Sequence, residues 1–238
     1  MIRSAILLAA GRGKRQRPYT DTTPKPLLPV HGRPTLDFIL RAVAKAGITR
    51  VCIVTHHLEQ QLFDFAGDGS QWHLQVTFAH QNELRGNGDA LLCVPREWIQ
   101  NEPFMVVATD YILEENSLLE LVEAHEKHDA EITMSLKECP IDELSARSSV
   151  DVDAEWRVHR IVEKPKPEQI LSPYAASVMF IFPPAIWDYL PRLQPSPRGE
   201  IETQAAVQMM IDDGCKAFGV LQPAPEEWDA ERHLAPNT

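Results

Sequence analysis

The sequence predicts an α/β protein in which helices cover both faces of a mostly parallel central sheet. Short apolar runs of strand length alternate along the chain with segments of helical periodicity, which is the order of parallel β-α-β units. The chain has 238 residues, 44% of them hydrophobic, which suffices for the core of one large domain. We therefore expect a single domain over residues 1–238.

The first half of the chain carries the alternation most clearly. Strands are expected at residues 2–8, 50–55, 74–79 and 104–109. Helices are expected around residues 36–43, 58–66 and 89–94. Ligands of such sheets bind at the carboxyl ends of the strands. The loop that begins at Ala9 and the turn at Asp110 should therefore lie at one edge of the sheet.

The second half departs from this order in one place. A helix around residues 118–122 and a strand at 131–136 continue the alternation, but residues 150–153 and 157–162 alternate apolar and polar positions, which predicts an antiparallel pair. A buried strand at 175–182, helices at 185–190 and 202–213 and a last strand at 216–221 complete the expected elements.

The composition limits the partners and the location. A formal net charge of -11 argues against nucleic acid as a partner but not against a single nucleotide. The chain contains no apolar run of about 18 residues and no leader pattern, so we expect no membrane partner and a cytoplasmic protein. The four cysteines are far apart, which predicts neither a disulfide framework nor a CxxC metal pair.

The stretch from Ala9 to Val30 is the strongest candidate site. Gly11 and Gly13 permit a turn whose backbone N–H groups point at one anion. Several prolines stiffen the stretch. The alternative is a solvated basic loop, but from Arg12 to Arg33 one acid, Asp21, stands among six basic residues, which favours a loop that binds a triphosphate. The six are Arg12, Lys14, Arg15, Arg17, Lys25 and Arg33.

Four further segments contain candidate residues, and each has an ordinary structural explanation as well. Asp110 ends an apolar strand and could offer an oxygen ligand to Mg²⁺, or be a common surface acid. Gly86 and Gly88 precede a short helix, and Asn87 between them could simply cap that helix. The Glu163-Lys164 pair could be solvated, and Glu200 could favour a helix start.

The order of these segments resembles the sugar-phosphate nucleotidyltransferases, the family of glucose-1-phosphate thymidylyl- and uridylyltransferases. The opening strand, the glycine pair, Arg15 and the Pro24-Lys25-Pro26 element match the opening signature of that family. The resemblance implies a Rossmann-like three-layer α/β/α sandwich and Mg²⁺ as cofactor. It also implies condensation of an NTP with a sugar-1-phosphate to give an NDP-sugar and pyrophosphate.

The resemblance also assigns residues to roles. It implies Arg15 and Lys25 as catalytic residues, and Glu163, Lys164 and Glu200 as ligands of the sugar phosphate. The residues implied to bind the metal are Asp110 and Asp229. Those implied to bind the nucleotide are Ala9, Ala10, Gly11, Gly13, Lys14, Gln81, Gly86 and Asp110.

The chain departs from the family pattern at several of these segments. Lys14 stands where the family usually has Ser or Thr, Asn87 replaces a Thr, Thr109 replaces a Gly, and Gln204 stands where many relatives have Asp. Asp229 also lacks the Gly-Thr pair that usually follows the second metal ligand.

Two other functions stay open on the sequence. A cytidylyltransferase acting on phosphocholine or a small phosphonate would use similar loops, and an aromatic cage would favour it. A non-catalytic subunit that binds an NTP but releases no pyrophosphate would account for the departures from the family pattern at Lys14, Thr109 and the C-terminal segment. The sequence does not determine the nucleotide base, the phosphorylated acceptor or the oligomeric state. A homo-oligomer stays open. The aromatic candidates for a cage are Trp156, Tyr174 and Trp187.

Overall fold

A seven-stranded sheet forms the centre of the structure, with the strand order β12-β8-β11-β6-β1-β4-β5. The computed structural model describes residues 1–196 and 198–234. Strand β11 runs antiparallel to both neighbours, whereas the other pairs are parallel. The predicted mostly parallel sheet is therefore confirmed. Its strands are β1 (Ser4–Leu8), β4 (Arg50–Thr55), β5 (Gln75–His80), β6 (Phe104–Ala108), β8 (Ile132–Glu138), β11 (Tyr174–Phe182) and β12 (Ala217–Leu221).

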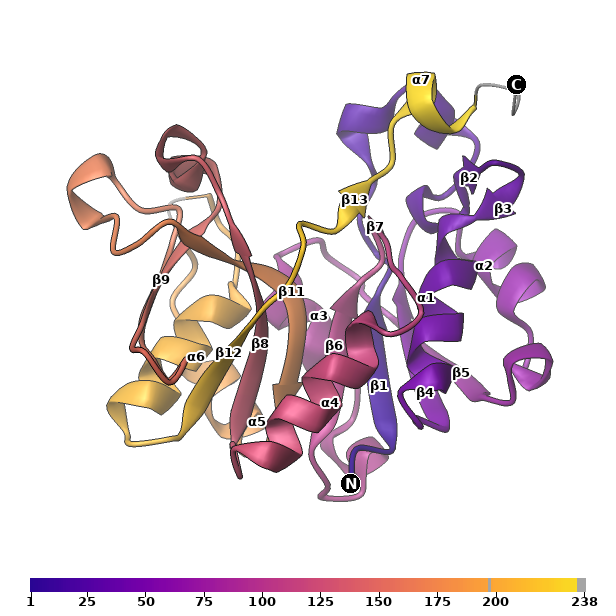
Figure 1. The fold of residues 1–238 in the computed structure, drawn as a ribbon. Helices are drawn as coiled ribbons and strands as arrows, with labels where there is room; N and C mark the ends of the chain where they lie inside the picture. Colours follow the sequence, from indigo (N-terminus) through magenta and orange to yellow (C-terminus); the bar gives the residue numbers. More distant parts are fainter. Residues whose placement is uncertain (197, 235–238) are drawn as a thin grey trace.

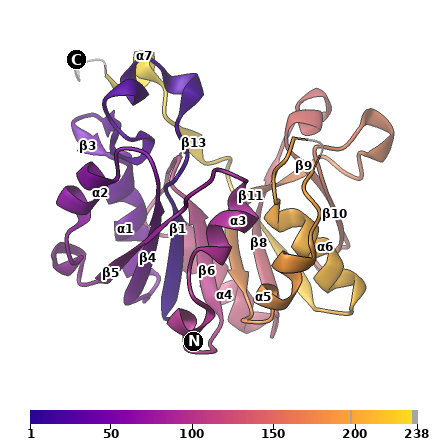
Figure 2. The same ribbon diagram turned by 180° about the vertical axis from the view of Figure 1, so that it is seen from behind.

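Helices cover both faces of this sheet, as the sequence predicts. Figure 1 shows α1 and α4 in front of the sheet, and Figure 2 shows α3 and α5 on the opposite face. Strand β1 is buried on both sides: Ala5 and Leu7 belong to the core under α1 and α4, and Ile6 belongs to the core under α3. The helices are α1 (Thr35–Lys45), α2 (Glu59–Ala66), α3 (Asn87–Leu92), α4 (Ser117–Lys127), α5 (Ile186–Tyr189) and α6 (Thr203–Asp212).

Helix α1 shows why the helical periodicity was informative. Leu36, Ile39, Leu40 and Val43 are fully buried and form one stripe that packs on the sheet. Gly47 follows the helix with a φ of 79°, a conformation that a side chain would disfavour. The apolar spacing sets the buried face, and the glycine ends the helix.

The predicted antiparallel pair forms an arm beside β11. Strands β9 (Ser148–Val152) and β10 (Val158–Glu163) pair antiparallel. The Ser148 hydroxyl oxygen accepts a hydrogen bond of 2.8 Å from the Ala176 N–H, near the start of β11. Because β11 is antiparallel, its start lies at the edge where the parallel strands end. The arm therefore stands at the edge of the sheet where ligands are expected.

The C-terminal segment returns to the basic loop. The strand expected at residues 216–221 forms as β12, but it is not the last strand, because β13 (Glu226–Glu227) follows and pairs with β7 (Tyr111–Ile112). The Trp228 indole N–H donates to the Pro29 carbonyl at 2.8 Å, and the Trp228 ring contacts Tyr19. Figure 1 shows the short helix α7 (Ala230–His233) beside the loop that follows β1. Two-residue strands have no periodicity that a sequence pattern could reveal.

The described helices include none that is both long and apolar enough to cross a membrane.

Candidate active site

The site begins where the strand order of the sheet reverses. The chain continues from β1 to β4 on one side, while β6 pairs with β1 on the other, so two loops leave the sheet side by side. Leu8 and Ala108 are register partners at the ends of β1 and β6. The Thr109 hydroxyl donates to the Leu8 carbonyl at 2.8 Å. Thr109 thus adds a bond between the two strands at the position where the family usually has glycine.

The glycine-rich loop is held by contacts within the loop. Gly13 has a φ of 59°, and its carbonyl accepts a hydrogen bond of 2.8 Å from the Thr20 hydroxyl. A Cβ on Gly13 would lie 2.7 Å from Thr20 Cγ2, whereas a Cβ on Gly11 would meet no atom within 4 Å. Gly13 is therefore required by conformation and packing, and Gly11 leaves its side of the loop open.

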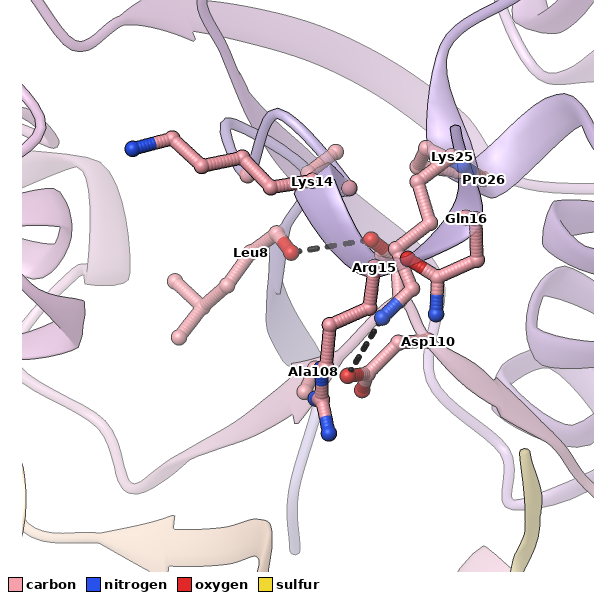
Figure 3. Close-up of a pocket in the computed structure, with 12 residues that line it drawn as sticks. Leu8, Lys14, Arg15, Gln16, Lys25, Pro26, Ala108 and Asp110 are labelled. Carbon is pink, nitrogen blue, oxygen red and sulfur yellow. Dashed lines mark hydrogen bonds and ion pairs between the residues drawn. The ribbon is translucent and has the colours of Figure 1, made fainter. Parts of the chain in front are cut away.

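A cavity of about 270 Å³ lies between the glycine-rich loop and the end of β6. Lys25 crosses it to reach Asp110, with 2.9 Å between Lys25 Nζ and Asp110 Oδ2. In Figure 3, Arg15 extends towards the end of β6 near Ala108, and Lys14 extends away from the Lys25–Asp110 pair. The cavity is thus lined by three basic residues and one carboxylate. The predicted residues that line it are Ala9, Gly11, Gly13, Lys14, Arg15, Lys25 and Asp110.

Two predicted residues take other places. The side chain of Ala10 is buried in the core beneath the loop, so only its backbone could meet a nucleotide. The Gln81 side chain is 2% exposed, and its amide donates to Asp89 Oδ2 at 2.8 Å. That hydrogen bond directs the Gln81 NH₂ group towards Asp89 of α3 and away from solvent.

The two candidate metal ligands differ in their surroundings. Asp110 Oδ1 is buried and has no hydrogen-bond partner among the residues described. Asp229 instead caps α7, because its Oδ1 accepts a hydrogen bond of 3.1 Å from the Arg232 N–H. Within residues 1–196 and 198–234, no group of three or more His, Cys, Asp or Glu side chains could hold a metal ion. Mg²⁺ typically takes one or two carboxylates plus water and phosphate oxygens, so Asp110 suits it and the capping role of Asp229 competes with ligation.

The loop before α3 is joined to the segment before α6. A Cβ on Gly86, whose φ is 103°, would lie 2.5 Å from the Ile201 carbonyl oxygen. The Asn87 side-chain oxygen accepts a hydrogen bond of 2.8 Å from the Thr203 N–H, and the Asn87 amide lies 3.4 Å from Gln204 Oε1. Asn87 therefore caps α6 and not its own helix. Two departures from the family pattern, Asn87 and Gln204, contact each other.

Five ionisable side chains gather at the end of β10. Lys164 Nζ lies 3.5 Å from Glu163 Oε1 and 3.8 Å from Glu202 Oε1. Arg198 Nη2 lies 2.5 Å from Glu200 Oε2 and 2.7 Å from Glu202 Oε1. The predicted Glu163, Lys164 and Glu200 are thus brought into one cluster. The sequence analysis did not identify Arg198 as a site residue. Its spacing of two and four residues from Glu200 and Glu202 could have indicated these ion pairs.

The Glu163 carboxyl has a strongly shifted pKa. Burial raises the pKa of Glu163 to about 8, and the nearby Glu202 carboxylate adds to the effect. Arg198 acts in the opposite direction and does not cancel it. At neutral pH Glu163 is therefore largely protonated when no ligand is bound, and can donate a hydrogen bond as well as accept one.

The aromatic residues that could form a cage do not meet at one point. The Trp187 ring packs against Phe104, with 4.9 Å between the ring centroids, and is 9% exposed. Trp156 instead contacts Tyr174, with 5.4 Å between the centroids. The three candidates thus form two separate pairs, and nothing in their arrangement favours a quaternary ammonium ligand.

Comparisons with known proteins agree with the motifs. A model of the family described as "Nucleotidyl transferase" matches residues 4–228. The uridylyltransferase "UTP--glucose-1-phosphate uridylyltransferase" of Pseudomonas aeruginosa is 30% identical over 244 residues, which cover 90% of this chain and 87% of that protein. The "Low-salt glycan biosynthesis nucleotidyltransferase Agl11" of Haloferax volcanii is 31% identical over 210 residues. That match covers 88% of this chain but only 57% of the Haloferax protein.

Solved structures with related folds cover nearly the whole chain. A UDP-glucose pyrophosphorylase complexed with UDP-glucose superposes with a TM-score of 0.84 at 22% sequence identity. The superposition covers 98% of this chain and 96% of that one. A putative glucose-1-phosphate thymidylyltransferase of Bacillus anthracis gives a TM-score of 0.80 at 23% identity, over 98% and 91% of the two chains. At these identities the likeness supports the fold.

The loop geometry predicts different effects for its two glycines. Gly13→Ala should lower the free energy of unfolding by about 1–3 kcal/mol, because the alanine must adopt a positive φ and its Cβ meets Thr20. Gly11→Ala is the matched control and should leave stability nearly unchanged, since a Cβ there has open space. Denaturant unfolding measures both. Equal stability of the two variants would contradict the assigned conformation of Gly13.

The raised pKa of Glu163 predicts how stability depends on pH. Between pH 4.5, the ordinary pKa of a glutamate, and about pH 8, the raised pKa, Glu163 is protonated in the folded state but ionised in the unfolded state. The stability contributed by this proton is therefore lost as the pH rises through that window. Glu163→Gln should lose less stability between pH 5 and pH 8 than the unsubstituted protein, measured as the change in Tm. Glu168→Gln, at an exposed position, should behave like the unsubstituted protein. An equal pH dependence of Glu163→Gln and the unsubstituted protein would refute the shift.

Proposed function

The chain belongs to the nucleotidyl transferase family, and from this premise we propose that it condenses an NTP with a sugar-1-phosphate. A phosphate oxygen of the sugar phosphate attacks the α-phosphorus of the NTP in line. A new P–O bond forms as the bond to the β-phosphate oxygen breaks, and the products are an NDP-sugar and pyrophosphate. The attacking phosphate is an anion at neutral pH, so no general base is required.

One observation carries this proposal. Lys25 Nζ lies 2.9 Å from Asp110 Oδ2 in a cavity bounded by the glycine-rich loop, at the place where the strand order reverses. Cationic groups and backbone N–H groups there would face the triphosphate, and the carboxylate would face its cation. Phosphoryl transfer depends mainly on such positioning and charge neutralisation.

The cavity supports a division of roles between its residues. Arg15 stabilises the leaving pyrophosphate and Lys25 stabilises the α-phosphate. The backbone from Ala9 to Gly13 holds the triphosphate, and Lys14 adds positive charge beside it. Gln81 and Gly86 form the part of the site nearest the base, where Gln81 would have to exchange its bond with Asp89 to meet the nucleotide.

Mg²⁺ suits the environment of Asp110. The buried Asp110 Oδ1 has no partner among the described residues, and a carboxylate oxygen is the ligand type that Mg²⁺ prefers. When bound, the cation would neutralise charge on the phosphates of both substrates. Asp110 would hold the cation, and Lys25 would keep the other carboxylate oxygen oriented.

The acceptor belongs at the charged cluster on the arm. Lys164 holds the phosphate of the sugar phosphate, and Glu163 and Glu200 bind sugar hydroxyls. A largely protonated Glu163 can donate a hydrogen bond to a hydroxyl oxygen and accept another from a neighbouring hydroxyl. We place both substrates in one domain formed by residues 1–238, in a cytoplasmic protein.

The direct experiment is pyrophosphate release with Mg²⁺. Each of dTTP, UTP, CTP, GTP and ATP is combined with a panel of sugar-1-phosphates, phosphocholine and 2-aminoethylphosphonate, beside an Asp110→Ala control. We expect release with a sugar-1-phosphate pair, abolished in the control. Pyrophosphate release with phosphocholine or the phosphonate, and with no sugar-1-phosphate, would show that the acceptor is not a sugar phosphate. No release from any pair, with NTP binding retained, would indicate a non-catalytic subunit.

Replacing Lys25 should lower the rate without loss of the fold. Lys25→Ala should lower kcat by at least about 100-fold, the scale of one lost charge-stabilising donor. Lys45→Ala, at an exposed position near the end of α1, is the matched control and should retain the unsubstituted rate. Steady-state pyrophosphate release measures both variants. An unchanged kcat for Lys25→Ala would reject the role assigned to that side chain.

A further inference from the structure

A buried lysine stands at the end of β8, outside the motifs described above. Lys137 is 5% exposed and is the register partner of Ala175 on β11. Lys25 lies within 4 Å of the Asp110 carboxylate, and Lys164 lies within 4 Å of the Glu202 carboxylate. Among the residues described, no hydrogen bond or ion pair engages the Lys137 ammonium. A lysine side chain with so little exposure usually has a paired charge, because burial of its stem limits the hydration of the ammonium.

The surroundings of Lys137 make its charge unfavourable in the ligand-free protein. Burial lowers the pKa of the Lys137 ammonium, and the nearby Arg147 guanidinium lowers it further. Cys139, Glu227 and Asp110 act in the opposite direction on the pKa of Lys137, and neither carboxylate forms an ion pair with its ammonium. Glu227 instead lies 3.7 Å from Arg147, so its carboxylate is shared with another cation.

The position of Lys137 joins the two halves of the site. Successive residues of a strand face opposite sides, and Leu136 belongs to the core that contains α6, so Lys137 faces the other side. Thr133 shares that side and contacts His125 of α4 at 2.9 Å. The charged groups that act on the pKa of Lys137 include Asp110, which follows β6, and Arg147, which precedes β9 on the arm.

We propose that Lys137 is a further substrate-contacting residue, which binds a phosphate oxygen when the substrates occupy the space between Asp110 and the arm. This role rests on the proposed function. The bound phosphate supplies the partner that the ligand-free protein lacks, and its charge offsets the proximity of Arg147. The phosphate belongs either to the acceptor or to the nucleotide, and the two sources share the same chemistry.

A purely structural lysine would behave differently. If Lys137 served as a counter-ion for Asp110 and Glu227, its removal would leave two half-buried acids less neutralised and would destabilise the protein. If it binds substrate, its removal relieves an unpaired buried charge. Function at the expense of stability is a common feature of binding sites.

The experiment uses Lys137→Met, which keeps the length and the apolar stem of the side chain, and Lys137→Arg, which keeps the charge. Lys137→Met should raise Tm by about 2–4 °C, the shift that a small stabilisation gives in a chain of this size. It should lower kcat/KM by about 10- to 100-fold, the range for one lost hydrogen bond to a charged group. Lys137→Arg should recover part of that loss.

Ligand-induced shifts in Tm identify the source of the phosphate without using activity. The probes are the NTP alone and the sugar-1-phosphate alone, each compared between the unsubstituted protein and Lys137→Met. Loss of the shift with the sugar-1-phosphate would assign the acceptor phosphate, and loss of the shift with the NTP would assign the nucleotide. Lys216→Met, at an exposed lysine 3.7 Å from Asp129, is the control and should keep both shifts.

Two results would overturn the proposal. Unchanged ligand-induced shifts together with an unchanged kcat/KM in Lys137→Met would show that Lys137 does not bind substrate, whatever its effect on stability. Substitution effects equal to those of Lys216→Met would show the same. Failure of the proposed function can be told apart from failure of the Lys137 proposal. In the first case the unsubstituted protein would release no pyrophosphate from any pair, while the ligand-induced shifts in Tm would still report on phosphate binding.

Discussion

The ion pair between Lys25 and Asp110 connects the two loops on which the site depends. Lys25 belongs to the long loop after β1, and Asp110 follows β6, the parallel neighbour of β1. The register of the two strands, together with the Thr109–Leu8 bond, places these loops next to each other. The carboxylate restrains the lysine within the cavity, and Gly13 and Thr20 fix the loop that presents Arg15. A site ordered before its ligand arrives loses less entropy on binding.

The part of the site proposed to bind the acceptor is tied to the part proposed to bind the nucleotide through backbone and capping bonds. Gly86 packs against Ile201, and Asn87 caps α6 through the Thr203 N–H, so the loop before α3 and the segment that carries Glu200 form one unit. The arm carries Glu163 and is anchored to the start of β11.

The sequence was sufficient for the elements with strong periodicity. The stripe from Leu36 to Val43 and the apolar runs of β1 and β6 predicted their elements, and topology placed Ala9 and Asp110 at one edge. Contacts between distant segments were not predictable, because no local pattern encodes them: Asn87 capping α6, Arg198 bridging two glutamates, or β13 pairing with β7. Lys137 was missed because burial of a lysine follows only from the tertiary fold.

A double-mutant cycle on Lys25 and Asp110 tests the central interaction most directly. The variants Lys25→Met, Asp110→Asn and the combination are compared by kcat/KM for the NTP that supports pyrophosphate release. If the two side chains act as one unit, the double variant should be about as impaired as the worse single variant. Losses in free energy of activation that simply add would show that the residues act independently, and would contradict the account of the pair as the organising contact of the site.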